Sequence, residues 1–367
     1  MKRILTGIQP SGGFHLGNYF GAIQPLIGMQ ERGQVFAILV DLHALTSVRD
    51  PEALRRFTRA AAVDFLACGL DPRRSVFFRQ SDVPHHTELM WILSTVTPMG
   101  LLERCHAYKD KVARGLGATH ALFAYPVLQA ADILLYDADV VPVGQDQKQH
   151  LEVARDIAVK MNEAYGPVLK LPEPDISEDI AIIPGLDGQK MSKSYGNTIE
   201  LFMEEKALRK RVMGIVTDST PLEEPKDPGG STIIELYRLF VPPDQVERMK
   251  ADFRAGGIGY GEFKQRLFEA IRDHFAPLRE RREELLRDPT TVDRVLREGA
   301  DRARDVAAGT FDRVRRAVGL VCRGMPCATL PGTGRSGREP RKTEGGRDES
   351  APRRGGGYRF EYGSGIP

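Results

Sequence analysis

The sequence has few cysteines, and their spacing fits neither a disulfide framework nor a zinc site. Four cysteines occur in 367 residues, and no two of them form a Cys-x-x-Cys pair. Structural zinc sites and small secreted domains depend on closely spaced cysteines. The pattern therefore favours a reducing compartment, and we expect a cytoplasmic protein without a metal site of its own.

Long apolar runs are missing as well. Apolar residues make up 41% of the chain. No stretch of about 18 of them occurs, so no membrane span is expected. The basic and apolar start is followed at once by Gln9-Pro10-Ser11, which argues against a signal peptide. The formal net charge of +2 neither requires nor excludes a nucleic-acid partner.

Residues 321–367 contain few aliphatic side chains and are rich in Gly, Pro, Arg and Ser. Such a composition cannot bury enough apolar surface to offset the entropy of ordering, so we predict a disordered tail. The tail has nine basic and five acidic residues, so the rest of the chain is slightly acidic. A tail that contacts RNA without specificity is one interpretation, and a solvated extension without function is the favoured one.

Short apolar runs alternate with amphipathic stretches through the first half of the chain. The run Val35–Val40 is apolar throughout, as in a strand buried on both faces. Further strands are predicted at 4–6, 76–79 and 140–144, and helices at 19–30, 51–68 (with Asp50 as N-cap and Gly69 as stop) and about 146–165. This alternation predicts an α/β fold with a doubly wound, parallel, Rossmann-like sheet.

The pattern changes after Asn197. Charge becomes dense, and apolar residues take helical spacing over 204–216, 244–254, 261–287 and 291–318. We expect a Rossmann-like domain over 1–197 and a mainly helical domain over 198–320, whose last helix could pack back on the first domain. Either 221–230, rich in Pro and Asp, or the lysine-containing loop that ends at Asn197 would be the linker.

A glycine-rich turn, Gly-Ile-Gln-Pro-Ser-Gly-Gly-Phe-His-Leu-Gly-Asn, follows the first predicted strand at 7–18. A nucleotide at the carboxyl ends of parallel strands meets helix N-termini, which favour phosphate. Gly12, Gly13 and Gly17 let the backbone approach a base and ribose. His15 and Asn18 offer polar groups for phosphate oxygens. A turn without any ligand is the alternative.

Two lysines three residues apart lie far downstream, in Lys-Met-Ser-Lys-Ser at 190–194. A mobile loop of this kind holds a triphosphate through Lys190 and Lys193, with Ser192 and Ser194 as further donors. The lysines can move with the departing pyrophosphate and stabilise its negative charge. Because this charge develops in the transition state, its stabilisation accelerates the reaction. A solvated basic loop is the alternative, which the upstream turn argues against.

The two runs resemble the HIGH and KMSKS signatures of class I aminoacyl-tRNA synthetases. Gly-Ile-Gln-Pro-Ser-Gly and His-Leu-Gly-Asn-Tyr, with Asn18 in place of the last His of HIGH, are similar to the bacterial tryptophanyl-tRNA synthetases. Further matches occur at 40–46, 125–136 and 141–150, and the similarity covers residues 1–320.

The resemblance implies ATP-dependent ligation of L-tryptophan to tRNA(Trp) through a tryptophanyl-adenylate. It implies Mg²⁺ accompanying ATP, no tightly bound prosthetic group, a homodimer, and a tRNA-binding role for the helical domain. It also implies catalytic roles for His15, Asn18, Lys190, Ser192 and Lys193. The implied ATP site comprises Gln9, Pro10, Ser11, Gly17, Asn18, Gly144, Gln145, Asp146, Ile183, Lys190, Met191, Ser192, Lys193 and Ser194.

For tryptophan, the resemblance implies that Asp132 accepts the indole N–H. An analogue without that N–H would leave a buried acceptor unpaired, which separates tryptophan from phenylalanine. The resemblance also implies that Tyr125 and Gln147 bind the α-amino group of tryptophan. The residues implied to line the pocket are His43, Leu5, Val141 and Val143. Plainer interpretations remain: Asp132 as a salt-bridged structural acid, His43 as a core histidine, Tyr125 as a packing residue and Asp146 as a helix N-cap.

Two residues depart from the family pattern. Gln129 stands where many bacterial relatives carry Met, and we hypothesise that its amide shares or tunes the indole hydrogen bond with Asp132. Leu5 stands where an aromatic residue is common, so the packing on the ring face is less defined.

The sequence gives weaker signals for the residues that contact tRNA or a second subunit. Candidate tRNA contacts are the arginines of the helical domain, although such charges usually form solvated helix faces: Arg279, Arg281, Arg282, Arg313, Arg315 and Arg316. A subunit contact could involve His85, His86, Met90, Trp91 and Leu93, with Trp91 equally explicable as a core residue.

Three other functions compete with this interpretation. A tyrosyl-tRNA synthetase shares both loops, but Gln9-Pro10-Ser11, Asn18 and Asp132 argue against it. A small-molecule adenylyl- or cytidylyltransferase rarely needs so large a helical domain after the lysine loop. A non-catalytic synthetase relative that binds RNA would not need both signatures intact.

Overall fold

The computed structural model describes residues 1–105, 119–143, 148–176 and 183–320. The predicted disordered tail at 321–367 and the predicted ATP and tryptophan residues Gly144, Gln145, Asp146 and Gln147 lie outside the described residues.

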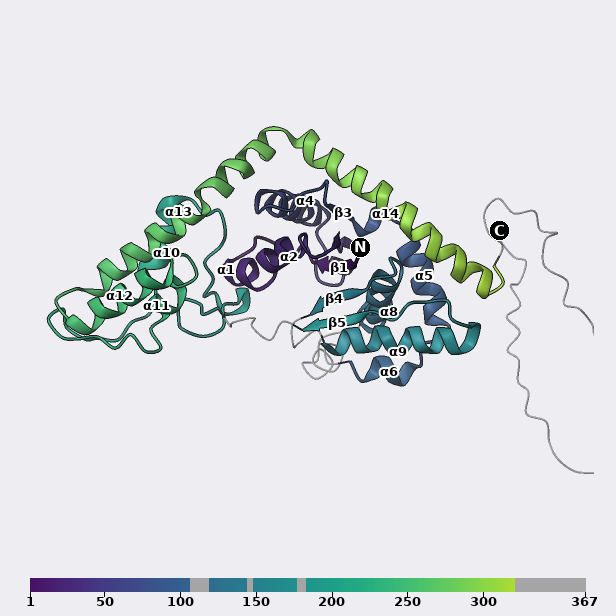
Figure 1. The fold of residues 1–367 in the computed structure, drawn as a ribbon, viewed down its shortest axis with the longest axis horizontal. Helices are drawn as coiled ribbons and strands as arrows, with labels where there is room; N and C mark the ends of the chain where they lie inside the picture. Colours follow the sequence, from purple (N-terminus) through teal and green to yellow (C-terminus); the bar gives the residue numbers. More distant parts are fainter. Residues whose placement is uncertain (106–118, 144–147, 177–182, 321–367) are drawn as a thin grey trace, which may run out of the picture. The chain divides into compact units, whose positions relative to one another are not determined.

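A parallel five-stranded sheet forms the centre of the first half of the chain (Figure 1). Its strands are β1 (Arg3–Ile8), β2 (Gln34–Leu39), β3 (Ser75–Arg79), β4 (Val140–Val143) and β5 (Glu173–Ile176), in the order β3-β2-β1-β4-β5. The four strands predicted from the sequence are confirmed. The fifth was not predicted because Glu-Pro-Asp-Ile has no apolar run. Its proline is tolerated because β5 lies at the sheet edge.

Successive side chains of the strands enter two separate cores, one on each face of the sheet. In β2, Val35, Ala37 and Leu39 belong to one core, and Phe36 and Ile38 belong to the other. All five are completely buried. This explains the continuous apolar run in the sequence, because both sets of side chains of a parallel strand are covered.

Helices cover both faces of the sheet, so the predicted doubly wound fold is confirmed. The helix predicted at 51–68 is α4, which Asp50 caps by accepting a hydrogen bond from the Glu52 amide at 2.9 Å. The helix predicted at 19–30 is a π-helical turn (Tyr19–Ile23) followed by α2. The helices of this half are α1 (Leu16–Asn18), α2 (Gln24–Met29), α3 (Asp41–Ala44), α4 (Pro51–Ala67), α5 (His85–Ser94), α6 (Met99–Glu103), α8 (His120–Leu134) and α9 (Lys148–Tyr165).

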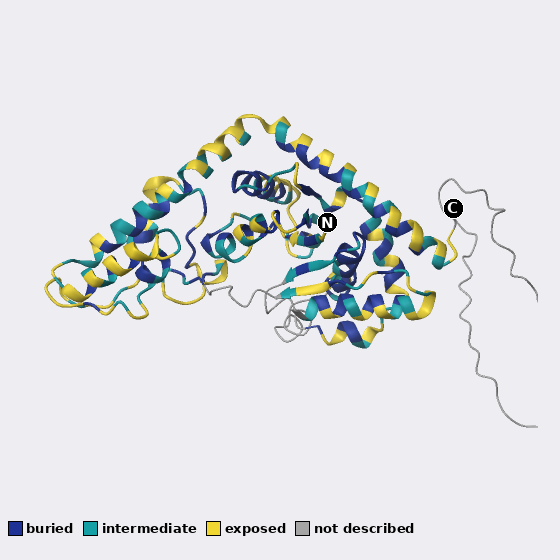
Figure 2. Ribbon diagram, in the orientation of Figure 1, coloured by how far each residue is buried: buried dark blue, intermediate teal, exposed yellow. Residues whose placement is uncertain are grey.

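The second half of the described chain is helical after the lysine loop. It contains α10 (Glu205–Met213), α11 (Thr232–Tyr237), α12 (Pro243–Ala255), α13 (Tyr260–Arg287) and α14 (Pro289–Ala317). Four of these were predicted, and the short α11 was not. Buried and exposed residues alternate along α13 and α14, as the bands in Figure 2 show. Among the described residues, none of the helices combines the length and the apolar composition of a membrane-spanning segment.

Helix α14 packs on β3 and passes from one face of the sheet to the other. Val292, Val295 and Leu296 join the first core, whereas residues from Ala300 to Val314 join the second. Gly299 lies at the crossing, where an added Cβ would be 1.8 Å from the carbonyl oxygen of Phe77. Only glycine allows the helix backbone to approach the strand so closely.

Candidate active site

Two adjoining cavities open at the carboxyl ends of the strands, where β1 and β4 lie side by side. The helix cavity, about 540 Å³, lies between β1, β4 and α8. The turn cavity, about 400 Å³, lies under the glycine-rich turn after β1. Thr6, Gly7 and Gln9 line both cavities. Sheets of this kind bind ligands at the point where the strand order reverses, which here is between β1 and β4.

The glycine-rich turn leads from β1 into α1. Gly12 has a φ of +110°, a conformation that side-chain-bearing residues rarely adopt, and an added Cβ would be 3.4 Å from the Lys193 Nζ. At the start of α1, the amide oxygen of Asn18 accepts a hydrogen bond from the His15 backbone N–H at 3.1 Å. Asn18 therefore shapes the turn through its oxygen.

His15 is buried at the base of the turn. Burial, and then the positive charge of Lys193, lower its pKa to about 4. The imidazole is therefore neutral near pH 7, and its buried Nδ1 has no hydrogen-bond partner among the described residues. A neutral histidine beside a lysine does not add to the local positive charge, so it can hydrogen-bond a ligand without repelling the ammonium group.

The lowered pKa of His15 predicts a pH-dependent loss of stability. Because the folded pKa is below that of the unfolded chain, the contribution is complete above pH 6.5 and is lost as the pH falls toward 4. We expect the wild type to lose about 3 kcal/mol of unfolding free energy relative to His15→Asn between pH 7 and pH 4. Urea unfolding at several pH values measures this, with His120→Asn on the protein surface as control. Parallel pH profiles of wild type and His15→Asn would contradict the prediction.

The lysine loop is ordered by Asn197. Its side-chain oxygen accepts from the Ser192 amide at 2.8 Å, and its NH₂ group donates to Asp187 at 2.7 Å and to the Lys190 carbonyl at 3.2 Å. Asn197 is 4% exposed. One buried amide thus closes the loop from 187 to 197 and holds it in a defined shape.

The lysine loop lies over the glycine-rich turn. Lys193 Nζ donates to the Ser11 carbonyl at 3.3 Å, across a sequence separation of 182 residues. Backbone bonds join the following segment to the same turn, from Leu16 N to Ile199 O (2.9 Å) and from Leu201 N to Phe14 O (2.8 Å). Burial lowers the pKa of Lys193. The fold therefore brings one lysine of the loop onto the turn cavity.

The structure brings some of the predicted ATP residues together and leaves others apart. Those that line the turn cavity are Gln9, Ser11, His15, Asn18, Ser192 and Lys193. Lys190 and Ser194 are exposed, and Ile183 and Met191 are buried in the core below the loop. Neither these four nor Pro10 and Gly17 line the turn cavity.

Asp132 is the charged group of the helix cavity, and it is held by three side chains. Oδ1 accepts from Gln80 Nε2 and from His86 Nδ1, each at 2.7 Å, and Oδ2 accepts from His43 Nε2 at 2.9 Å. The hydrogens belong to the histidines, because an ionised carboxylate only accepts. Burial alone would raise the pKa of Asp132, but hydrogen bonds from His43 and His86 outweigh it and lower the pKa to about 2.

The predicted tryptophan residues gather around this acid. Those that line the helix cavity are Leu5, His43, Tyr125, Gln129, Asp132 and Val141. The side chain of Val143 is outside the described part, as is Gln147. The Tyr125 hydroxyl lies 2.6 Å from His150 Nε2, and burial raises the pKa of Tyr125 to about 12. Sequence reasoning missed Gln80, His86 and His150 as site residues, and only their proximity in the fold reveals them.

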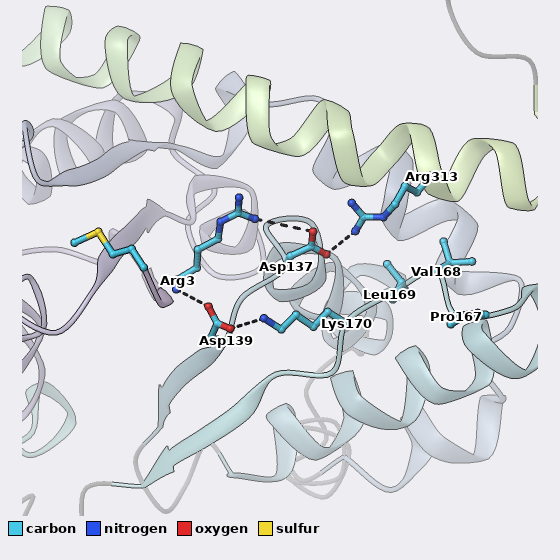
Figure 3. Close-up of a pocket in the computed structure, with 9 residues that line it drawn as sticks. Arg3, Asp137, Asp139, Pro167, Val168, Leu169, Lys170 and Arg313 are labelled. Carbon is cyan, nitrogen blue, oxygen red and sulfur yellow. Dashed lines mark hydrogen bonds and ion pairs between the residues drawn. The ribbon is translucent and has the colours of Figure 1, made fainter.

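A third cavity, about 600 Å³, lies at the opposite, amino-terminal edge of the sheet (Figure 3). Its charged side chains pair with one another. Asp137 binds Arg313 of α14 at 2.6 Å and lies 4.0 Å from Arg3, and Asp139 accepts from Lys170 and from the Arg3 amide. These pairs join β1, α14 and the segment after α8, so we interpret this cavity as structural.

Comparison with known proteins identifies the family. The model for "tRNA synthetases class I (W and Y)" matches residues 1–276. The chain therefore belongs to the class I tRNA synthetases for tryptophan and tyrosine. Two curated relatives that the chain matches over nearly their whole length are tryptophan–tRNA ligases. The chain is 55% identical to the tryptophan–tRNA ligase of Rhodopirellula baltica, over 87% of this chain and 99% of the relative. It is 52% identical to that of Fusobacterium nucleatum, over 88% and 99%.

Solved structures agree with this assignment. Tryptophanyl-tRNA synthetase from Campylobacter jejuni, complexed with ADP and tryptophan, is 49% identical, with a TM-score of 0.84 over 87% of this chain and 100% of that one. The Mycoplasma pneumoniae enzyme is 33% identical, with a TM-score of 0.74 over 88% and 98%.

Proposed function

We propose that the protein joins L-tryptophan to tRNA(Trp) at the expense of ATP, through a tryptophanyl-adenylate. The observation that carries this proposal is the contact of Lys193 with Ser11 over the turn cavity, which continues through Gln9 into the helix cavity beside Asp132. A triphosphate under the lysine and an amino acid beside the acid would meet where the two cavities join. Relatives about half identical over nearly their whole length are tryptophan–tRNA ligases, which supports the same substrate here.

The chemistry needs positioning and charge stabilisation, with no covalent enzyme intermediate. The carboxylate of tryptophan attacks the α-phosphorus of ATP, the bond to the β-phosphate oxygen breaks, and pyrophosphate leaves. In the turn cavity, Lys193, Ser192 and the neutral His15 bind phosphate oxygens of ATP. They stabilise the negative charge that moves onto pyrophosphate. A hydroxyl of the terminal ribose of the tRNA then attacks the acyl carbon, the bond from that carbon to the phosphate oxygen breaks, and AMP leaves.

Mg²⁺ accompanies ATP in this proposal, bound to the phosphates that it neutralises. Within the described residues, no group of three or more His, Cys, Asp or Glu side chains forms a metal site. In this proposal the nucleotide holds the ion, and the lysine loop shares the phosphate charge with it.

Amino-acid-dependent exchange of pyrophosphate into ATP tests the proposal. Across the twenty amino acids, only tryptophan should support exchange. Exchange with tyrosine would indicate a tyrosyl-tRNA synthetase, exchange without an amino acid a small-molecule nucleotidyltransferase, and no exchange a non-catalytic relative. Each of these results would overturn the proposal.

The division into a catalytic domain at 1–197 and a tRNA-binding domain at 198–320 is part of the proposal. Some of the arginines suggested for tRNA contacts are engaged within the protein. Arg282 binds Asp64 at 2.6 Å, Arg313 binds Asp137 at 2.6 Å, and Arg315 lies 3.6 Å from Glu88. Exposed Arg281 and Arg316 are better placed for phosphates. The few, widely spaced cysteines favour a reducing compartment, so a cytoplasmic location is part of the proposal.

A homodimer is proposed on the resemblance and on the exposure of α5. Trp91 is 75% exposed and nearby Met99 is 63% exposed, so the alternative of a core tryptophan is wrong. His86 and Leu93 are completely buried and cannot reach a partner. Trp91→Asp should shift the protein from dimer to monomer in sedimentation velocity at micromolar concentration. Leu286→Asp, at an equally apolar exposed position on α13, is the control. A wild type that sediments as a monomer would contradict the dimer.

Gln129 lies one helical turn before Asp132 on α8, and both line the helix cavity. Residues three apart share a helix face, so the amide is near the proposed indole site. Gln129→Met should lower kcat/KM for tryptophan by about fivefold, as expected for the loss of one hydrogen bond. Steady-state exchange kinetics measure this, with exposed Gln245→Met as control. An unchanged kcat/KM removes Gln129 from indole recognition.

A further inference from the structure

Two of the three donors to Asp132 approach it from the side away from the helix cavity. Gln80, in the short helix Gln80–Asp82 after β3, and His86, at the start of α5, are both completely buried. Neither lines the cavity, whereas Asp132 and His43 do. Both donate to Oδ1. They therefore act on the carboxylate without access to a ligand.

A buried tyrosine supports His86 from behind. The Tyr136 hydroxyl lies 2.7 Å from His86 Nε2, and Tyr136 has no exposed surface. Burial, and then the charge of Asp132, raise the pKa of Tyr136, so the hydroxyl keeps its proton. A neutral His86 satisfies both contacts, because Nε2 accepts from the hydroxyl and Nδ1–H donates to Asp132. The hydrogen bonds thus run in one direction, from Tyr136 through His86 to the carboxylate.

Tyr136 is itself fixed in place. Its ring contacts those of Phe36 and Phe78, with centroid distances of 5.0 and 5.7 Å. Arg3 donates to its carbonyl at 3.0 Å and belongs to the ion-pair group of Figure 3. The hydrogen-bonded series therefore runs from Arg3 of β1, through Tyr136 and His86, to Asp132 of α8.

Counting acceptor sites shows what this arrangement leaves open. An ionised carboxylate offers about four lone-pair sites. Gln80 and His86 occupy two on Oδ1, and His43 occupies one on Oδ2. Among the described residues, nothing occupies the remaining site, which is on Oδ2, the oxygen that also binds the cavity-lining His43. With both sites of Oδ1 occupied, the carboxylate cannot rotate without breaking two buried hydrogen bonds.

We propose that His86, supported by Tyr136, is a positioning residue that leaves Asp132 one acceptor site facing the cavity. Preference for a ring with an N–H donor then depends on a histidine that does not touch the substrate. The inference rests on the proposed tryptophan specificity and extends it to a second layer of residues. If His86 is removed, the carboxylate can turn Oδ1 toward the cavity or admit water, and a ring without a donor is no longer penalised as strongly.

A pair of substrates isolates this effect. β-(Benzothien-3-yl)alanine has the shape of tryptophan with sulfur in place of the indole N–H. The ratio of kcat/KM values for the two substrates in pyrophosphate–ATP exchange measures the indole hydrogen bond alone. His86→Leu should lower this ratio at least about tenfold, and Tyr136→Phe about threefold, since a buried hydrogen bond to a charged group is worth about 1.5–3 kcal/mol. His86→Asn, whose NH₂ group can replace Nδ1–H, should restore most of the ratio.

A matched control is available in the chain. The Tyr19 hydroxyl lies 3.2 Å from His274 Nε2, which makes a second, partly buried tyrosine–histidine pair away from Asp132. Tyr19→Phe should leave the ratio unchanged. A general loss of folding lowers kcat/KM for both substrates equally and leaves the ratio unchanged. Loss of the proposed positioning role lowers the ratio. If His86→Leu and Tyr136→Phe keep the wild-type ratio, the inference is wrong. If the wild type shows no exchange with tryptophan, the proposed function itself fails.

Discussion

Lys193→Ala is expected to lower the kcat of tryptophan-dependent pyrophosphate–ATP exchange by about a hundredfold or more, with little change in the KM for tryptophan. Lys193 is the lysine that the structure places on the turn cavity, 3.3 Å from the Ser11 carbonyl. Pyrophosphate gains charge as it leaves, so a cation held there contributes most in the transition state. Loss of one such preorganised donor costs about 10²–10³ in rate.

Lys206→Ala on α10 removes an exposed lysine of the helical region and serves as the matched control. Lys190→Ala gives a further comparison, because Lys190 belongs to the same loop but does not line the turn cavity. A larger effect at Lys190 than at Lys193 would mean that the loop takes another arrangement when ATP is bound. A wild-type kcat in Lys193→Ala would remove the loop from the proposed mechanism.

Asp132→Asn should lower kcat/KM for tryptophan about a thousandfold, or roughly 4 kcal/mol of transition-state stabilisation. An amide has one acceptor oxygen, whereas Gln80, His86, His43 and the indole all present donors. Its NH₂ group would face another donor, so at least one buried group would lose its partner. Because the pKa of Asp132 is about 2, the charged acceptor is present at every pH above about 4.

Asp64 provides a matched control for the removal of a buried negative charge. It is 5% exposed against 4% for Asp132, and it pairs with Arg282 between α4 and α13. Asp64→Asn should destabilise the fold without a selective loss of tryptophan activity. Comparable kcat/KM values for wild type and Asp132→Asn would show that Asp132 does not bind the indole.

The sheet and the two signature loops could be predicted because their signals are local. An apolar run such as Val35–Val40 indicates a strand buried on both faces, and a residue such as Asp50 before Pro51 indicates a helix start. The edge strand β5 has neither signal. Contacts across 182 residues, such as Lys193 with Ser11, follow from the tertiary fold and from no sequence periodicity.

The surroundings of Asp132 show why the site was only partly predictable. Motif resemblance pointed to Asp132, His43 and Tyr125, which line one cavity. It assigned no site role to Gln80, His86 and Tyr136, because their side chains meet only when β3, α5 and the end of α8 are packed together. His86 follows His85 and precedes Thr87 and Glu88, so its polarity does not stand out in the sequence.

The crossing of α14 over β3 has a consequence for synthesis of the protein. β3 is an edge strand, and unprotected strand edges are prone to pair with other chains. The helix that seals this edge runs from residue 289 to 317, so it leaves the ribosome long after the strand does. The nascent chain must therefore avoid aggregation until its synthesis is nearly finished. A chain that terminates before Gly299 would be released with the edge of β3 uncovered and able to pair with other chains.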